Sequence, residues 1–208
     1  MKNIEILYED DVSIIVNKPA GLAVQGGAGI KTSLDKILSE IRTPSPLLVH
    51  RLDRDTSGAL LAAKGREAAF KFSKIFASSN GLKKVYIAVC AGCPEKAEGI
   101  ITDDLVIRGD TKSSVTKYKI IETGEYSVLE LEPGTGRMHQ IRRHLAMKGN
   151  PILGDDKYGD FPLNKKLRKE KGLKRLLLHS FRLIIKGEYN IDISAPVPVD
   201  FNPYFSHN

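Results

Sequence analysis

Short runs of apolar and other β-favouring residues, bounded by polar turns, recur along the chain, and this pattern predicts β-strands. The first two runs, 4–8 and 12–16, are separated by Glu9-Asp10-Asp11, which predicts a hairpin turn. Further strands are predicted at 47–49, 59–63, 83–90, 100–107, 114–121, 126–131, 176–178, 181–186 and 189–194.

Apolar residues recur at helical spacing in three other segments, at 34–41, 66–79 and 138–147. Asn80-Gly81 should end the second helix, because glycine favours the C-terminal cap. In the third helix Ile141 and Leu145 should face the core, whereas another face is basic and carries His139, Arg142 and Arg143. Helices and strands mix without regular alternation. We therefore predict one α+β domain over 1–208, with a mixed, mostly antiparallel central sheet and flanking helices and loops.

A polar stretch of unusual composition, His50-Arg51-Leu52-Asp53-Arg54-Asp55-Thr56-Ser57-Gly58, lies between two predicted strands. Its last four residues favour a turn, because three can bond their own backbone and glycine tolerates positive φ. By composition alone it is a solvated turn whose ion pairs contribute little. The same turn can instead hold two arginines and two aspartates at fixed spacing on a rigid scaffold.

The net charge limits the classes of partner. Among 208 residues, Lys+Arg 32 against Asp+Glu 25 gives +7 and a pI near 9.3. A basic surface suits RNA, although solubility alone could account for the same total. The charge is densest in 163–175, which is either a solvated helix face or an RNA-facing arm; its basic residues are Lys165, Lys166, Arg168, Lys169, Lys171, Lys174 and Arg175.

The two cysteines, Cys90 and Cys93, have CxxC spacing. One such pair does not complete a tetrahedral zinc site unless histidines join it. Two reduced thiols in a cytoplasmic protein are the expected state. The first residues, 1–5, contain no apolar leader segment, and no run is long enough to span a membrane. We therefore expect a cytoplasmic protein with no membrane partner.

The polar stretch 50–58 resembles the catalytic motif of the RluA-type pseudouridine synthases, His-Arg-Leu-Asp-x-x-Thr-Ser-Gly. Other segments resemble that family's signatures in the same order: 12–22 the N-terminal signature, 84–88 the tyrosine motif, 136–142 the arginine motif, and then 154–160 and 178–180. The segments 155–160 and 171–176 are most similar to the ribosomal large-subunit pseudouridine synthase C branch.

This resemblance implies an isomerase that converts uridine in RNA to pseudouridine. The C1′–N1 bond breaks, the uracil turns, and a bond to C5 forms, so the atoms balance and neither a cofactor nor a metal is expected. The resemblance assigns the catalytic carboxylate at the ribose of a flipped uridine to Asp53. Attack on the sugar carbon and removal of a ribose proton both remain open. Arg142 would keep Asp53 ionised, and Tyr86 would stack on the uracil.

The resemblance also implies substrate-binding residues. Arg51 would fill the gap that the flipped nucleotide leaves, while His50 and Thr56 would shape the loop. The remaining three would contact the substrate backbone or brace Arg142, and they are Arg137, His139 and Gln140.

The expected partner is RNA, with 23S ribosomal RNA as the first substrate class and transfer RNA as the alternative. We expect a monomer without the N-terminal S4 domain that many large-subunit synthases carry. Two rival functions stay open. One is a metal-dependent RNA hydrolase using His50, His139 and His144, although the last two fall on different faces of a helix. The other is a catalytically silent RNA-binding or ribosome-assembly module.

Overall fold

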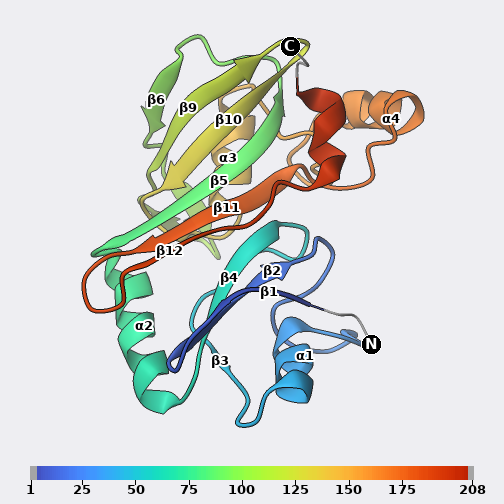
Figure 1. Ribbon diagram of the computed structural model, residues 1–208. Helices are drawn as coiled ribbons and strands as arrows, with labels where there is room; N and C mark the ends of the chain where they lie inside the picture. The colour runs from blue at the N-terminus through green and yellow to red at the C-terminus, as the bar shows by residue number, and fades with distance from the viewer. Residues whose placement is uncertain (1–3, 206–208) are drawn as a thin grey trace. The chain divides into compact units, whose positions relative to one another are not determined.

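The computed structural model describes residues 4–205, so 1–3, where no leader was expected, lie outside it. The chain forms two compact units, and Figure 1 traces their elements along the chain. Unit 1 comprises the chain up to Lys84 together with Ser180–Pro196, and unit 2 comprises Val85–His179 and the chain from Val197. The predicted α+β class with a mostly antiparallel sheet is confirmed. The single domain over 1–208 stays a prediction.

In unit 1 the strands follow the order β1-β2-β4-β11, with β3 beside β4 and β12 beside β11. The pairings β1–β2, β2–β4, β3–β4 and β11–β12 are antiparallel. The bounds are β1 Glu5–Glu9, β2 Ser13–Lys18, β3 Leu47–Leu48, β4 Ser57–Ala63, β11 Leu178–Ile185, β12 Ile191–Ser194, α1 Leu34–Ile41 and α2 Arg66–Ser78.

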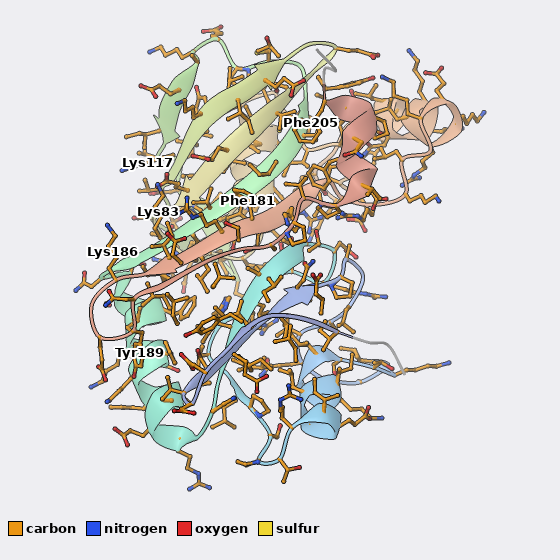
Figure 2. The ribbon with its side chains drawn as sticks, viewed as in Figure 1. Lys83, Lys117, Phe181, Lys186, Tyr189 and Phe205 are labelled. Atoms are coloured by element: carbon orange, nitrogen blue, oxygen red, sulfur yellow. The ribbon has the colours of Figure 1, made fainter. Side chains whose placement is uncertain are left out.

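The core of unit 1 forms where α2 packs against β4. Phe72 of α2 is fully buried, and the Tyr189 ring, labelled in Figure 2, lies 4.3 Å from it between ring centroids. The predicted turn between β1 and β2 is confirmed, because Asp10 Oδ1 accepts the backbone N–H groups of Val12 and Ser13 at 2.9 and 2.6 Å. These contacts give the loop between β3 and β4 a rigid base.

In unit 2 the strands follow the order β5-β10-β9-β6, with β7 and β8 as a separate hairpin, and α3 packs on β9 and β10. The bounds are β5 Leu82–Ala91, β6 Glu98–Ile101, β7 Leu105–Ile107, β8 Asp110–Lys112, β9 Thr116–Thr123, β10 Tyr126–Pro133, α3 Gln140–Met147, α4 Phe161–Glu170 and the 3₁₀ helix η1 Val199–Tyr204. Ile141 and Leu145 of α3 are buried, as predicted.

Several predicted boundaries were wrong. The strand predicted at 100–107 is two strands, because the backbone between them turns so that the Asp103 carbonyl accepts the Ser114 hydroxyl at 2.7 Å. The strands predicted at 176–178 and 181–186 are one continuous strand, β11, since its polar centre is buried. Helix α2 ends at Ser78, and its C-cap is Ser79 rather than Asn80-Gly81. Ser79 adopts the left-handed conformation (φ 59°), and its N–H donates to the Ile75 carbonyl.

Within residues 4–205, every helix is too short or too polar to cross a membrane. Both cysteines are free thiols: Cys90 is buried in β5 and Cys93 is exposed. Burial raises the pKa of the Cys90 thiol, so it stays protonated at neutral pH and packs as a small apolar side chain.

Candidate active site

The motif loop joins β3 to β4 and turns at Arg54 and Asp55. The backbone carbonyl of Asp53 accepts the Thr56 N–H at 3.2 Å, and this hydrogen bond closes the turn. Asp53 is half-buried, Thr56 is buried and Arg51 is exposed. The loop therefore holds the Asp53 carboxylate on a tight turn, packs Thr56 inward, and leaves Arg51 accessible to a large ligand.

Lys18, at the end of β2, anchors this loop through hydrogen bonds. It is fully buried, and its Nζ donates to the carbonyl oxygens of Leu22 at 2.9 Å, Arg54 at 2.9 Å and Pro19 at 3.0 Å. A buried ammonium is tolerated only when it is paired or hydrogen-bonded, so these acceptors fix its position. The N-terminal signature is thereby tied to the residue next to Asp53. The sequence included Lys18 only within the N-terminal signature, since nothing in the sequence indicates that this lysine is buried.

Gly58 ends the motif where β11 runs alongside β4. Its φ is +111°, and a Cβ atom there would lie 2.2 Å from the Ser180 carbonyl oxygen. The Ser180 hydroxyl donates to the Ala59 carbonyl at 3.0 Å. Only glycine satisfies both the backbone conformation and the close approach. The signature that ends at Ser180 therefore contacts the catalytic motif directly.

His50 supports the loop through packing. Its ring stacks on Phe76 with centroids 4.1 Å apart, and its Nε2 accepts the Leu61 N–H at 2.9 Å. Burial, and to a smaller degree the Lys84 charge, lower the pKa of His50 to about 3, so the ring is neutral at physiological pH. This geometry suits the expected role of His50 in shaping the loop, and it occupies one of the two ring nitrogens that could bind a metal.

Tyr86 lies on β5 in unit 2, directly opposite Leu131 of β10 in the antiparallel register. Its neighbours Val85 and Ile87 are buried, whereas Tyr86 is half-buried. Strand alternation thus places the ring on the opposite face from these two apolar side chains. A half-exposed aromatic ring on a rigid strand can stack on a nucleobase.

Gln140 is the buried centre of the arginine motif. Its Oε1 accepts from the Thr135 hydroxyl at 2.6 Å and the Arg137 N–H at 3.0 Å. Its Nε2 donates to the Val115 carbonyl at 2.8 Å and the Thr116 hydroxyl at 3.0 Å. Gln140 therefore braces the start of α3, and its expected contact with the substrate backbone or with Arg142 stays a prediction.

Arg137 and His139 of the same motif lie nearer the surface. Arg137 is exposed, and its Nε donates to the Ser113 carbonyl at 3.1 Å. His139 adopts the left-handed conformation (φ 53°) just before α3, and its Nδ1 lies 3.1 Å from the Tyr158 hydroxyl. The three residues of the predicted basic face of α3 do not share one set of contacts. Arg143 donates to the Val106 carbonyl at 3.0 Å, away from Tyr158.

Arg142 is buried on α3 and forms a two-point ion pair with Asp155. Its Nε and Nη2 donate to the two Asp155 carboxylate oxygens at 2.8 and 2.7 Å, and Nη2 also reaches Asp156 at 3.1 Å. The side chains of Arg142 and Asp155 are 5% and 1% exposed, so the pair is fully desolvated. The guanidinium carbon lies 5.3 Å from the centre of the Tyr158 ring.

Two opposing effects set the protonation of Asp155. Burial acts to raise the pKa of its carboxyl, but hydrogen bonds from Arg142 and from the backbone N–H groups of Tyr158 and Lys157 outweigh burial and leave the pKa below its usual value. Asp155 is therefore ionised, and it holds the Arg142 fork in one orientation. The resemblance indicated Arg142 but did not indicate that Asp155 is its partner. The only sequence signal for Asp155 was its position within the 154–160 signature.

A sequence model described as RNA pseudouridylate synthase matches residues 12–147, which is more than half of the chain. The chain belongs to the RNA pseudouridylate synthase family. A structure of human RNA pseudouridylate synthase domain containing 4 superposes with a TM-score of 0.84 at 25% identity, covering 95% of this chain and 90% of that one. Human RNA pseudouridylate synthase domain containing 1 gives 0.78 at 27% identity, with 94% and 84% covered.

Curated relatives are similar over most of this chain. Ribosomal large subunit pseudouridine synthase C of Rickettsia bellii is 35% identical, covering 95% of this chain and 69% of that protein. The protein of the same name from Vibrio parahaemolyticus is 37% identical, with 92% and 65% covered. Arabidopsis thaliana RNA pseudouridine synthase 4, mitochondrial, is 42% identical, with 74% and 40% covered. The chain thus spans between 40 and 69% of the length of these relatives.

The pseudouridylate synthase signatures form contacts within each unit. In unit 1 the N-terminal signature bonds the catalytic motif, and Ser180 packs against Gly58 at the end of the motif and bonds Ala59 directly after it. In unit 2 the arginine motif bonds the 154–160 signature through Arg142 and His139. Signatures far apart in sequence therefore assemble into two scaffolds, one that carries Asp53 and one that carries Arg142.

The rival metal hydrolase has a poor ligand set. The ring nitrogens of His144 are engaged, with Nδ1 2.9 Å from the Thr116 hydroxyl and Nε2 2.8 Å from the Ser114 hydroxyl. His50 uses Nε2 for a backbone N–H. In the part of the chain that the structure describes, no three His, Cys, Asp or Glu side chains gather closely enough to hold a metal ion. Family membership and this geometry both favour the isomerase.

Proposed function

We propose that this chain converts uridine to pseudouridine in RNA and that Asp53 acts at the ribose of the target nucleotide. The observation that carries this proposal is the family match over 12–147, because that span includes the three proposed catalytic residues, Asp53, Tyr86 and Arg142. The loop that bears Asp53 supports the proposal, since it is anchored by the buried Lys18 and by the contact at Gly58.

The chemistry needs no external group. The C1′–N1 bond breaks, the uracil turns within the site, and C1′ bonds to C5. C5 then loses its hydrogen to solvent, while N1 gains a proton, so substrate and product are isomers. An ionised carboxylate is required at C1′, either as a nucleophile or as a base toward the ribose. The half-buried position of Asp53 is consistent with this requirement.

Arg142 would supply the positive charge that keeps Asp53 ionised. Asp155 holds the guanidinium by Nε and Nη2 and so fixes its orientation. In this proposal Asp155 is a positioning residue that orients Arg142 without touching the uridine. Tyr86 would stack on the detached uracil and keep it within the site while it turns.

The remaining residues would support the nucleotide. The exposed Arg51 would take the place of the flipped nucleotide in the RNA stack. Arg137 and His139 would contact the RNA backbone from the surface of the arginine motif. The other three would act through the protein by holding the two motifs in shape, and they are His50, Thr56 and Gln140.

We propose large-subunit ribosomal RNA as the substrate class, because relatives named ribosomal large subunit pseudouridine synthase C are 35–37% identical over at least 92% of the chain. Transfer RNA is the second candidate class. A cytoplasmic location is supported by the two free thiols, which suit a reducing compartment. We also propose that the protein is a monomer.

The decisive experiment measures tritium release from RNA labelled at C5 of uridine. Large-subunit ribosomal RNA and bulk transfer RNA are each prepared from a strain that lacks the gene. We expect release from the ribosomal RNA, undiminished by EDTA. Release only from transfer RNA would reassign the substrate.

Two results would overturn the enzyme itself. Loss of activity in EDTA, with RNA cleavage, would favour the metal hydrolase. RNA binding by the wild type with no tritium release from either RNA would favour the catalytically silent module.

A further inference from the structure

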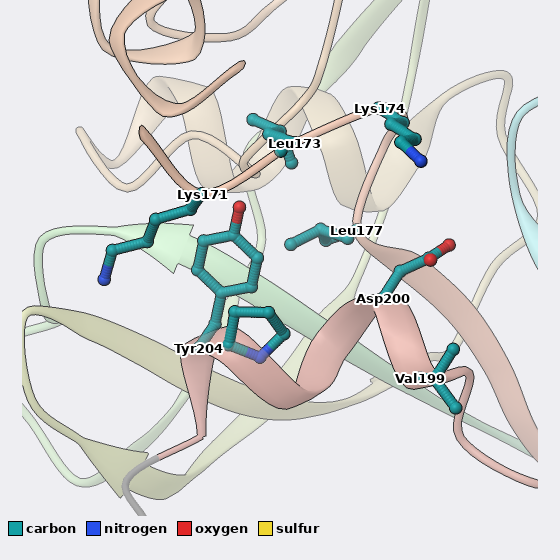
Figure 3. Close-up of a pocket in the computed structure, with 9 residues that line it drawn as sticks. Lys171, Leu173, Lys174, Leu177, Val199, Asp200 and Tyr204 are labelled. Atoms are coloured by element: carbon teal, nitrogen blue, oxygen red, sulfur yellow. The ribbon is translucent and has the colours of Figure 1, made fainter. Parts of the chain in front are cut away.

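Buried hydroxyl groups of unit 2 differ in their partners. Tyr204 lines a cavity of about 170 Å³ between the loop after α4 and η1, where Figure 3 shows it near Leu173, and its hydroxyl has no hydrogen bond within the described part of the chain. Thr116, the first residue of β9, is fully buried, and its hydroxyl bonds two side chains of α3. The Thr116 hydroxyl is therefore a point at which α3 is anchored to the sheet.

Gln140 and His144 contact this hydroxyl from successive turns of α3. Gln140 Nε2 donates to Thr116 Oγ1 at 3.0 Å, and His144 Nδ1 lies 2.9 Å from the same oxygen. Residues four apart lie on one face of a helix, so both side chains reach one atom of the strand. The Thr116 backbone is paired with Ile101 of β6 and Pro133 of β10, so the sheet holds it in place. One strand atom thus fixes where this turn of α3 lies on β9.

Backbone groups determine the direction of these hydrogen bonds. The Arg137 N–H can only donate and the Val115 carbonyl can only accept, so the oxygen and nitrogen of the Gln140 amide are assigned. The Gln140 nitrogen therefore donates to Thr116, and the one proton of the Thr116 hydroxyl is left for His144 Nδ1. The His144 ring thus accepts at Nδ1.

The second ring nitrogen of His144 agrees with this direction. Nε2 lies 2.9 Å from the Asp103 carbonyl oxygen, which can only accept, so Nε2 carries the ring proton. The Ser114 hydroxyl lies 2.8 Å from Nε2 and donates to the same carbonyl at 2.7 Å. Burial lowers the pKa of His144, although its hydrogen bond to the Asp103 carbonyl and the nearby Asp103 carboxylate act to raise it, so the ring is neutral at neutral pH.

Arg142 lies midway along the same turn of α3. It is two residues from Gln140 and two from His144, so it projects from the opposite side of the helix, where Asp155 holds its guanidinium. Asp155 fixes the end of this side chain, whereas Thr116 fixes the helix that carries it. Displacement of a reacting or stabilising group by about 1 Å can cost about a hundredfold in rate. The position of α3 on β9 is therefore relevant to catalysis.

We propose that Thr116 and His144 are positioning residues, which place Arg142 for the isomerisation without touching the uridine. The inference rests on the proposed function, in which the Arg142 charge keeps Asp53 ionised. His144 acts as the neutral ring protonated at Nε2, because only that form accepts the Thr116 proton while it donates to the Asp103 carbonyl. Position 116 then requires a hydroxyl and not only a side chain of suitable volume.

The test compares Thr116→Val with Thr116→Ser. Valine keeps the branched shape without the hydroxyl, whereas serine keeps the hydroxyl. Tritium release is measured per folded molecule, at a temperature at which circular dichroism shows each variant to be folded. We expect Thr116→Val to lower kcat by about tenfold or more, with the KM for RNA unchanged because no RNA contact is altered. Thr116→Ser should restore most of the activity.

Ser114→Ala is the matched control. It removes another buried hydroxyl from the same ring, and it leaves the Asp103 carbonyl as the partner of Nε2. Its kcat should stay near the wild-type value, even where its Tm falls as far as that of Thr116→Val. A wild-type kcat in folded Thr116→Val would overturn the inference. An equal loss of kcat in Ser114→Ala would overturn it as well, because loss of either hydroxyl would then act through stability alone.

The His144 ring gives a test that needs no folded variant at position 116. Nitrogen-15 NMR of the wild type distinguishes the two neutral forms of a histidine ring and its cation. We expect the neutral form protonated at Nε2 at neutral pH. The form protonated at Nδ1, or the cation, would contradict the proposed direction of the hydrogen bonds and overturn the inference.

Tritium release by the wild type keeps this inference separate from the proposed function. If the wild type isomerises uridine and folded Thr116→Val matches it, only the positioning role fails. If the wild type releases no tritium from either RNA, the proposed function fails and the inference fails with it.

Discussion

Replacing Asp155 with Asn tests whether its ion pair with Arg142 is the main support of the arginine motif. Asn keeps the shape and one acceptor oxygen for the backbone N–H groups, so the substitution removes mainly the charge. Arg142 would then be a buried cation that has lost its principal partner. Breaking a buried pair by removing one member typically costs about 3–5 kcal/mol. For a chain of this length, that is a fall of roughly 6–20 °C in Tm.

The matched control is Asp156→Asn. Asp156 contacts the same Arg142 nitrogen at 3.1 Å, but its side chain is 71% exposed, against 1% for Asp155. Exposed ion pairs contribute about 0–1 kcal/mol, so Asp156→Asn should change the free energy of unfolding little. Urea denaturation of both variants at neutral pH gives the comparison. Equal losses of stability would refute the argument that burial decides the strength of the pair.

A double variant, Arg142→Met with Asp155→Asn, separates stability from catalysis. Both buried charges are removed together, and the asparagine oxygen keeps an acceptor for the Lys157 and Tyr158 N–H groups, so this protein should unfold closer to the wild-type midpoint than Asp155→Asn alone. Tritium release should nevertheless be abolished, since the proposed mechanism needs the Arg142 charge beside Asp53. Wild-type turnover by the stable double variant would show that Arg142 is structural only.

Four other predictions follow from the site and its surroundings. Asp53→Asn should cut tritium release below about a thousandth of wild type, roughly 4 kcal/mol, while RNA binding measured by filter retention persists; substantial turnover would exclude Asp53 as the catalytic carboxylate. Gly58→Ala should lower the free energy of unfolding by more than about 1 kcal/mol, because both its φ and the approach of β11 exclude a Cβ; a thermal melt at wild-type temperature would contradict this. The pKa of His50 lies below that of an unfolded histidine, so its contribution to stability is complete above pH 6.5 and declines as pH falls toward about 3; His50→Gln should flatten that decline in urea melts. Glutamine at three α4 lysines should flatten the salt dependence of log Kd for RNA by about two units, at ~0.7 per phosphate contact, and an unchanged slope would make them surface charge only; the three are Lys165, Lys166 and Lys169.

Local sequence patterns predicted most helices and strands, because at those positions no long-range contact opposes the local preference. Short apolar runs identified β2 and β4, and the helical stripe identified α1 with its actual bounds. The errors fell where a long-range contact overrides local preference. The split between β6 and β7 depends on Ser114, and the continuity of β11 depends on burial of its polar centre. The 3₁₀ helix η1 follows Pro198, where the sequence indicated only the end of the sheet.

In the candidate site, too, local sequence identified some residues, whereas long-range contacts determined others. The resemblance pointed to Asp53 and Arg142 because their motifs are contiguous in sequence. It did not indicate that Lys18 bonds the Arg54 carbonyl, 36 residues away, or that Asp155 holds Arg142. Both partners are ordinary charged residues by composition. Only the folded structure reveals that Lys18 and Asp155 are buried. Because they are buried, their hydrogen bonds hold the Asp53 loop and Arg142 in fixed positions.

The contact between Gly58 and β11 has a consequence for biosynthesis. Ser180 reaches the neighbouring Ala59 across 121 positions of the chain, so the partner of β4 leaves the ribosome long after β4 itself. All seven residues of β4 are buried in the finished protein. During translation this apolar strand therefore has an unpaired edge, which is the kind of surface on which nascent chains aggregate. We expect chaperones to shield β4 until β11 is synthesised, and the Asp53 loop to acquire its final shape only then.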